Sequence, residues 1–203
     1  MYWKYEYNRF FDSFEHYYSL YHHRNLELWA EYADGKVTKE ELNRQRYLYP
    51  LKAVGICDSA LAKAYEKDAL AAIPTKSKLM PHAREVLEYL SSKYNLYILS
   101  NGFKELQSHK MHSSGIDKYF KKIVLSDDIG VLKPWPEIFY FALSATQSEL
   151  KDSLMIGDSW ENDIAGAAGV GMHQVFYNLS GRMDLPFMPT YQISDLKELL
   201  DLL

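Results

Sequence analysis

The sequence predicts an α/β protein in two parts, an α-helical segment over residues 1–77 and a parallel-sheet core over residues 78–203. Two observations support this prediction. In the first part, apolar residues recur at three- and four-residue steps, which is typical of amphipathic helices. In the second part, short apolar runs of strand length alternate with helical patterns, which is typical of a parallel sheet covered by helices on both faces.

Four helices are expected in the first part, over residues 10–21, 26–34, 38–49 and 58–72. Thr38 and Glu41 have the spacing of a capping box, so Thr38 is the expected N-cap of the third helix. Pro50 is expected to end that helix, because proline has no backbone N–H to donate. Nine of the 17 tyrosines lie in the first 50 residues, which favours an aromatic layer between these helices.

Residues 73–78 have the composition of a linker, and the alternating pattern begins after them. Helices are expected over residues 81–93, 103–113, 137–145, 160–168 and 194–203, and strands over residues 96–99, 122–125, 154–156 and 174–177. Ser194 is the expected cap of the last helix. Because ligands of parallel sheets bind beyond the carboxyl ends of the strands, polar residues at those ends are the candidate functional residues.

Composition excludes several functional classes. The chain has 23 basic and 27 acidic residues, a net charge of −4, and no marked basic cluster, so we expect no nucleic-acid partner. Cys57 is the only cysteine, which rules out an internal disulfide and suits a reducing, cytoplasmic compartment. No apolar run approaches the roughly 20 residues that a membrane span needs, and the N-terminus lacks the apolar section of a signal peptide.

The first candidate site follows the strand expected at residues 96–99. Ser100-Asn101-Gly102 places a hydroxyl, an amide and a glycine turn directly before a helix, a combination that suits a phosphate-binding loop. The alternative is that Ser100 or Asn101 only caps the helix.

Two further candidates follow later strands. Lys133 precedes Pro134 in a stretch stiffened by prolines and is suited to neutralise a phosphoryl or carboxylate group, although an exposed loop lysine is the alternative. Asp158 and Asp163 follow the strand at 154–156 and supply carboxylates for a divalent cation. Their alternative role is an N-cap and a first-turn acid that favours the helix dipole.

Taken together and in this order, these residues resemble the motifs of the haloacid dehalogenase (HAD) superfamily. Residues 97–102 are similar to its second motif, Lys133-Pro134 to its third and residues 157–163 to its fourth. Residues 1–77 are similar to the helical cap domain of the subgroup that includes 2-haloacid dehalogenases and nucleotide or sugar-phosphate phosphatases. Residues 78–203 are similar to the Rossmann-like core domain of that family.

The resemblance implies a role for each motif. Ser100, Asn101 and Gly102 would bind the transferring phosphoryl group, Lys133 would neutralise it, and Asp158 with Asp163 would hold Mg²⁺. Ser100 and Lys133 are therefore the expected catalytic residues. We expect the side chains at positions 100, 133, 158 and 163 to lie within roughly 10 Å of one another at one edge of the core.

The first motif of the family, a strand ending in Asp-X-Asp, is absent from the sequence. Its first aspartate is the family's nucleophile, and Asp127-Asp128 has the wrong spacing and follows a different strand. The strand itself is the central one of the family's sheet, so we expect the strands at 96–99 and 154–156 to flank a gap. We expect a longer product to supply the motif, a genuine short form being the alternative.

The expected function is Mg²⁺-dependent hydrolysis of a small phosphomonoester by the complete protein, as a monomer or homodimer, with the present chain inactive. Asp158 and Asp163 favour phosphatase chemistry, because halide displacement from carbon needs no divalent cation. The alternatives are a 2-haloacid dehalogenase and a non-catalytic protein that binds a phosphorylated ligand.

Overall fold

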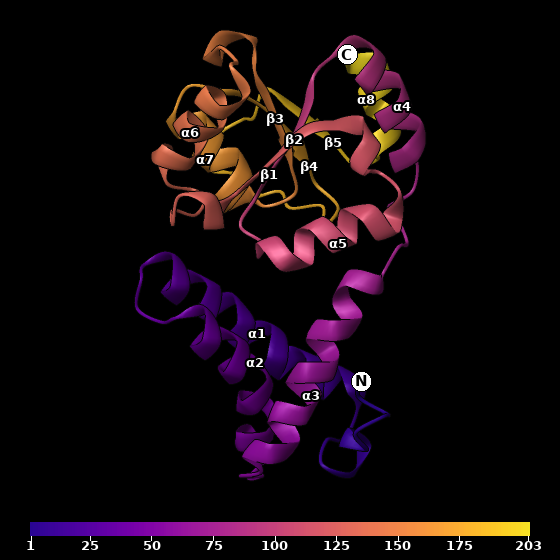
Figure 1. Cartoon of the computed structure of the whole chain (residues 1–203), viewed down its shortest axis with the longest axis vertical. Coiled ribbons are helices and arrows are strands. Elements are labelled where there is room, and N and C mark those ends of the chain that lie inside the picture. The colour runs from indigo at the N-terminus through magenta and orange to yellow at the C-terminus, as the bar shows by residue number, and fades with distance from the viewer. The chain divides into compact units, whose positions relative to one another are not determined.

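The computed structural model describes all residues from Met1 to Leu203. The chain forms two compact units, Met1–Thr75 and Lys76–Leu203 (Figure 1). The first unit is helical and the second alternates helices with parallel strands, so the predicted combination of an N-terminal helical region and parallel sheets is confirmed.

Three α-helices build the helical unit: α1 (Phe14–Ala33), α2 (Lys39–Ala53) and α3 (Ser59–Ala72), with 3₁₀ turns at Tyr7–Arg9 and Ile73–Thr75. Each α-helix begins at a residue whose side chain accepts a hydrogen bond from the first turn: Ser13 from the His16 N–H, Thr38 from the Glu41 N–H and Asp58 from the Leu61 N–H. Thr38 is therefore the N-cap that the sequence predicted.

Two expectations for this unit were wrong. Residues 10–21 and 26–34 do not form separate helices; α1 runs through both, because residues 22–25 contain no glycine or proline and Arg24 pairs with Glu27 and Glu31 further along the same helix. Pro50 does not end α2, which continues to Ala53. Its ring is buried, and burial of the last turn of the helix offsets the missing hydrogen bond.

The predicted aromatic layer is present as four buried tyrosines packed around Tyr65, here called the tyrosine cluster: Tyr7, Tyr17, Tyr47 and Tyr65. Tyr65 stacks on Tyr7 at 4.7 Å between ring centroids and lies 5.5 Å from Tyr47. Burial is the main reason that the pKa of each of the four phenols lies above its ordinary value of about 10. This cluster is the centre of the helical unit's core.

The second unit contains α4 (Ala83–Lys93), β1 (Leu96–Ser100), α5 (Lys104–Ser114), β2 (Phe120–Leu125), α6 (Pro136–Thr146), β3 (Leu154–Gly157), a π-helix (Trp160–Ala165), α7 (Gly166–Gly169), β4 (His173–Tyr177), β5 (Tyr191–Ile193) and α8 (Leu199–Leu202). Short 3₁₀ turns lie at 117–119, 126–128, 150–152 and 196–198.

The C-terminal region differs from the sequence expectation. A short strand, β5, pairs with β4 where no strand was expected, and it is three residues long. Ser194 does not cap the last helix. Asp195 caps the 3₁₀ turn that precedes α8 by accepting a hydrogen bond from the Lys197 N–H, while Ser194 donates to the Glu198 carboxylate. The last helix, α8, begins at Leu199 and is shorter than predicted.

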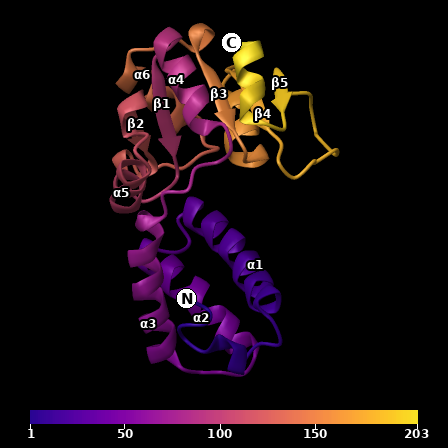
Figure 2. The ribbon, with the colours of Figure 1, turned by 90° about the vertical axis from the view of Figure 1, so that its right-hand side faces the viewer.

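The strands form two separate parallel sheets, β1–β2 and β3–β4–β5. Figure 2 shows β1 and β3 as the facing edges of these sheets, and neither strand pairs on that side. Leu96 of β1 and Leu154 of β3 nevertheless pack against the same hydrophobic cluster beside α4 and α8. On the opposite face, Leu99 and Met155 share a cluster with α6 and α7. The two sheets therefore share a hydrophobic layer on each face, while the edges of β1 and β3 between them stay unpaired.

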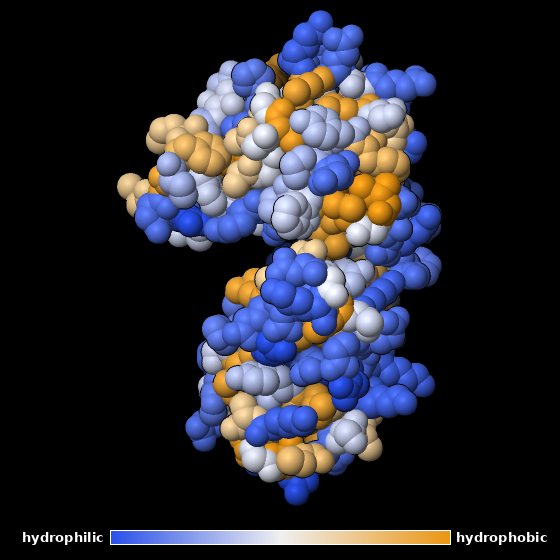
Figure 3. All heavy atoms as spheres, turned by 90° about the vertical axis from the view of Figure 1, so that its left-hand side faces the viewer, coloured by the Kyte–Doolittle hydropathy of each residue, from blue (hydrophilic) through white to orange (hydrophobic).

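No helix of the structure is both long and apolar enough to cross a lipid bilayer. The face drawn in Figure 3 is largely hydrophilic, and its apolar residues gather in several places, most clearly on the core unit. This matches the mixed acidic and basic composition of the chain.

Candidate functional site

The carboxyl ends of β1 and β3 carry the candidate residues of the core unit. Ser100 is the last residue of β1, and Asp158 directly follows the last residue of β3. Lys133 lies in the segment between β2 and α6. Ser100 and Asp158 therefore lie at the carboxyl ends of strands in parallel sheets, where the ligands of such sheets bind.

Lys133 joins the two strand ends. Its ammonium group is buried and donates hydrogen bonds to the backbone carbonyl of Leu99 at 2.8 Å and to Asp163 Oδ1 at 2.5 Å. The Asp163 side chain is also buried, with 7% of its surface exposed. The pair is therefore a shielded ion pair at the centre of the site, and the alternative of an exposed loop lysine does not apply.

Asn101 holds the Lys133 backbone rather than capping α5. Its side-chain oxygen accepts from the Lys133 N–H at 2.7 Å, and its side-chain nitrogen donates to the Lys133 carbonyl at 2.9 Å. The two hydrogen bonds fix the loop of residue 133 against the end of β1. The amide of Asn101 is thus occupied by protein, which gives it a positioning role in this structure.

The Ser100 hydroxyl is oriented by two donors. Its oxygen accepts from the Gly102 N–H at 3.0 Å and from the Gln107 side-chain nitrogen at 2.7 Å. A hydroxyl that accepts two hydrogen bonds still has its own proton to donate. A Cβ at Gly102 would overlap the Gln107 side chain, so a larger residue there would displace Gln107 from its contact with Ser100. Sequence reasoning missed Gln107, because a glutamine in the first turns of a helix carries no distinctive signal.

Asp163 is folded back toward β3. Its Oδ2 accepts from the Ser159 N–H at 3.0 Å, so both carboxylate oxygens have protein partners. A Cβ at Gly157 would collide with this carboxylate, which explains the glycine at the end of β3. Ser159, not Asp158, is the N-cap of the π-helix and accepts from the Asn162 N–H. Asp158 is exposed and has no hydrogen-bond or ion-pair partner.

Carboxylate oxygens are the donors that Mg²⁺ prefers, and Asp158 offers one that is unengaged. Nowhere does the chain gather three or more acidic, histidine or cysteine side chains in a metal-binding group. The donor set thus suits Mg²⁺ in chemistry and is too small in number. The assignment of Asp158 and Asp163 to a metal remains a prediction.

The acids at 127 and 128 have structural partners. Asp127 accepts from the Lys104 N–H at 3.0 Å, at the start of α5, and Asp128 accepts from the Leu125 N–H at 2.9 Å. These contacts tie the turn after β2 to neighbouring backbone. Neither acid replaces the missing Asp-X-Asp motif.

A family model described as haloacid dehalogenase-like hydrolase matches residues 3–171. The chain belongs to this family. The HAD-hydrolase YfnB of Bacillus subtilis is 31% identical over 182 residues, which cover 88% of this chain and 76% of YfnB. The pyrimidine 5′-nucleotidase YjjG of Escherichia coli is 31% identical over 181 residues, which cover 88% of this chain and 79% of YjjG.

Solved structures agree with this assignment. A crystal structure of YfnB bound to magnesium superposes with a TM-score of 0.81 at 30% identity, covering 92% of this chain and 81% of YfnB. A dehalogenase structure superposes with a TM-score of 0.80 at 25% identity, covering 98% of this chain and 88% of the dehalogenase. The HAD-like fold of the chain, with its N-terminal helical region, is therefore established.

Proposed function

We propose that this HAD-like hydrolase acts, in its complete form, as a Mg²⁺-dependent phosphatase of a small phosphomonoester such as a nucleotide or a sugar phosphate. The observation that carries the proposal is the buried Lys133–Asp163 pair, whose lysine also contacts the backbone of β1 at Leu99, one residue before Ser100. The nucleotidase activity of YjjG and the magnesium bound to YfnB support the same reaction class.

Each polar group has a proposed task. The Lys133 ammonium has three N–H donors, of which the carbonyl of Leu99 and the carboxylate of Asp163 use two, so one is left for a phosphoryl oxygen. The Ser100 hydroxyl donates its proton to a second phosphoryl oxygen, and the Gly102 loop completes the phosphate site. Asn101 keeps Lys133 in place through the two backbone hydrogen bonds.

Asp158 and Asp163 are the proposed Mg²⁺ ligands of this chain. When bound, Mg²⁺ supplies positive charge that offsets the charge of the phosphoryl oxygens. Asp163 also orients Lys133, so we expect its substitution to affect both metal and phosphate binding.

The nucleophile is the part that this sequence does not contain. We infer that a further parallel strand, ending in Asp-X-Asp as in the family's first motif, fits between β1 and β3. The unpaired edges of these strands and the hydrophobic layers shared by both sheets support this inference. The chain of residues 1–203 alone is accordingly proposed to show no turnover, and a reducing cytoplasm is its proposed compartment.

The dehalogenase alternative rests on the dehalogenase structure that the chain resembles. The unengaged carboxylate of Asp158 favours the phosphatase, since halide displacement has no need of a cation ligand there. A phosphate-binding role without catalysis is the other alternative, and it requires only Ser100 and Lys133.

The test uses a version of the protein in which an Asp-X-Asp strand precedes Met1. It is assayed on a panel of nucleotide and sugar phosphates with and without EDTA, and on 2-haloacids. The proposal requires phosphate release that EDTA abolishes and that Lys133→Gln reduces by at least about 10²-fold, in the range of losses for removing one electrostatic stabiliser. EDTA-resistant halide release without phosphate release would establish the dehalogenase instead.

A further inference from the structure

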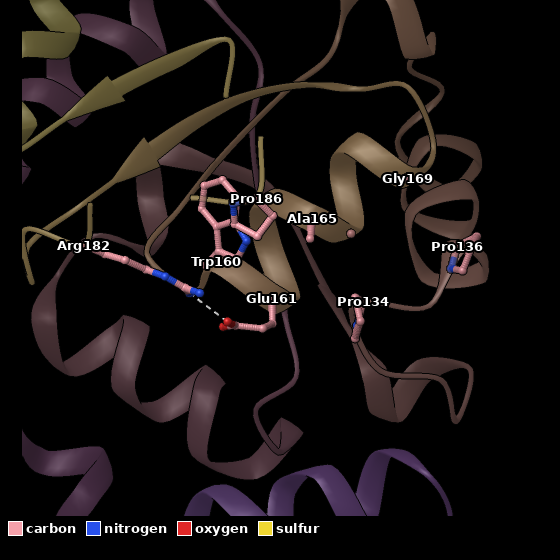
Figure 4. A pocket seen from close by; sticks show the side chains of 9 residues that line it. Pro134, Pro136, Trp160, Glu161, Ala165, Gly169, Arg182 and Pro186 are labelled. Atoms are coloured by element: carbon pink, nitrogen blue, oxygen red, sulfur yellow. Dashed lines mark hydrogen bonds and ion pairs between the residues drawn. The ribbon is translucent and has the colours of Figure 1, made fainter. Parts of the chain in front are cut away.

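We propose that a pocket on the core unit, separate from the phosphate site, binds a flat aromatic ring that carries uncharged or cationic N–H donors. The pocket has a volume of about 410 Å³, which lies within the range of small-molecule sites. Figure 4 shows its lining side chains. They come from the loop after Lys133, from the π-helix with α7, and from the segment between β4 and β5.

The walls of the pocket favour a flat, apolar body. Pro134, Pro136 and Pro186 present rigid rings, and Gly169 leaves open space beside the helix, since a Cβ there would meet no atom within 4 Å. No freely rotating apolar chain has to be displaced, so a planar ring can enter at little cost in side-chain entropy.

Trp160 gives one wall of the pocket a fixed position. Its indole is buried and packs on Phe176 at 5.2 Å and on Phe187 at 4.9 Å between ring centroids. The Arg182 guanidinium lies 5.6 Å from the centroid of the same ring. The wall is thus built before any ligand arrives, which is the condition for binding without rearrangement.

The rim of the pocket selects for charge. Glu161 forms an ion pair with Arg182 at 2.8 Å, and Asp184 lies 3.6 Å from the same guanidinium. Glu161 and Arg182 offset each other, so the excess negative charge comes from Asp184, which is exposed beside the pocket and is not part of its lining. This charge disfavours phosphate and carboxylate groups and favours N–H donors.

The pocket borders the proposed phosphate site through shared elements. The π-helix contributes Trp160 and Glu161 to the pocket and Asp163 to the ion pair with Lys133. Pro134, in the opposite wall, directly follows Lys133. π-helical segments are frequent at functional sites, and this one contributes residues both to the pocket and to the ion pair with Lys133. A ring bound here is therefore placed to modulate the neighbouring site, although its binding does not depend on the proposed reaction.

Three probes of nearly the same shape test the inference: benzamide, benzamidine and benzoate, which are neutral, cationic and anionic. Binding to the 203-residue protein is measured by ligand-observed NMR titration. We expect saturable binding of benzamide and benzamidine with Kd values on the order of millimolar, as for fragments of this size, and at least about tenfold weaker binding of benzoate.

Gly169→Leu tests the location. Gly169 lines the pocket, a Cβ there meets no atom within 4 Å, and the residue lies in α7 without a positive φ, so we expect a leucine side chain to be accommodated and to occupy pocket space. We expect it to abolish binding of benzamidine, whereas Lys121→Leu, which adds the same side chain at an exposed position of β2, leaves binding unchanged. Glu161→Gln should narrow the difference between benzamidine and benzoate to less than about threefold.

Three results would overturn the inference. They are no saturable binding of benzamide or benzamidine, benzamidine binding that survives Gly169→Leu, and benzoate binding as tightly as benzamidine in the unmodified protein. None of these results depends on phosphate release, so the ligand-binding inference and the proposed phosphatase activity are tested independently.

Discussion

Lys133→Met removes the charge that the buried Asp163 carboxylate depends on. Both side chains are more than 90% buried, and the ion pair between them is 2.5 Å long. Removing one partner of such a pair leaves an uncompensated buried charge, which costs about 3–5 kcal/mol. For a unit of this size, that loss lowers Tm by roughly 10–20 °C.

Urea unfolding followed by hydrogen-exchange mass spectrometry is the assay, because it reports the two units separately. The amides of β1 and β3 should lose protection at lower urea in the variant, whereas those of α1 and α3 in the helical unit should not change. Lys104→Met is the matched control: Lys104 pairs with Asp128 at 3.6 Å on the surface, and its loss should cost less than about 1 kcal/mol.

A double variant, Lys133→Met with Asp163→Asn, separates the buried charge from other effects. Without the carboxylate there is no unpaired charge, so we expect at least about half of the lost stability to return. A Lys133→Met protein within about 1 kcal/mol of the unmodified one, or a double variant less stable than the single one, would refute the reasoning about this pair.

Three further outcomes are expected. Gly157→Ala should destabilise the core unit by about 1–3 kcal/mol, because the added methyl group overlaps the Asp163 carboxylate. Gly169→Ala should leave the stability nearly unchanged, and equal melting curves for the two variants would contradict this reasoning. Asn101→Ala should weaken phosphate binding measured by calorimetry, because the Lys133 backbone loses the two hydrogen bonds that hold it in place. Unchanged phosphate affinity would show that Asn101 has no positioning role. The tyrosine cluster should stay protonated at a pH where exposed tyrosines ionise, because the pKa of each of its four phenols is raised. The free energy of unfolding should therefore fall as the pH rises above about 10, by up to about 1.4 kcal/mol per pH unit for each buried phenol, since the unfolded chain releases those protons first. Phenolate absorbance that rises in one step at the ordinary pKa of tyrosine would exclude this.

The sequence was sufficient for the elements whose signals are local. Strand-length apolar runs predicted β1 to β4, and the N-cap position of Thr38 was predicted from its spacing to Glu41. Signals that depend on burial were misread. Pro50 was expected to end a helix, but packing of the last turn of α2 outweighs one missing hydrogen bond.

For the site, sequence order was sufficient to pick out the residues that follow the strands, because parallel strands bring their carboxyl ends to one edge. Sequence order did not reveal which of these residues position others and which remain available to a ligand. Asn101 holds the backbone of Lys133, and Gln107 orients Ser100, through contacts 32 and seven residues apart in sequence. Such contacts depend on the tertiary structure and produce no periodic pattern in the sequence.

The central claim is that this chain has the phosphoryl- and metal-binding side of a phosphatase site and lacks the nucleophile. The most direct measurement is Mg²⁺-dependent phosphate release by the purified 203-residue chain, compared with the version that carries an Asp-X-Asp strand before Met1. We expect no measurable turnover by the first, since loss of a nucleophile removes about 10⁴- to 10⁶-fold in rate, and EDTA-sensitive turnover by the second. Robust hydrolysis by the 203-residue chain, abolished by Asp158→Asn, would contradict the account.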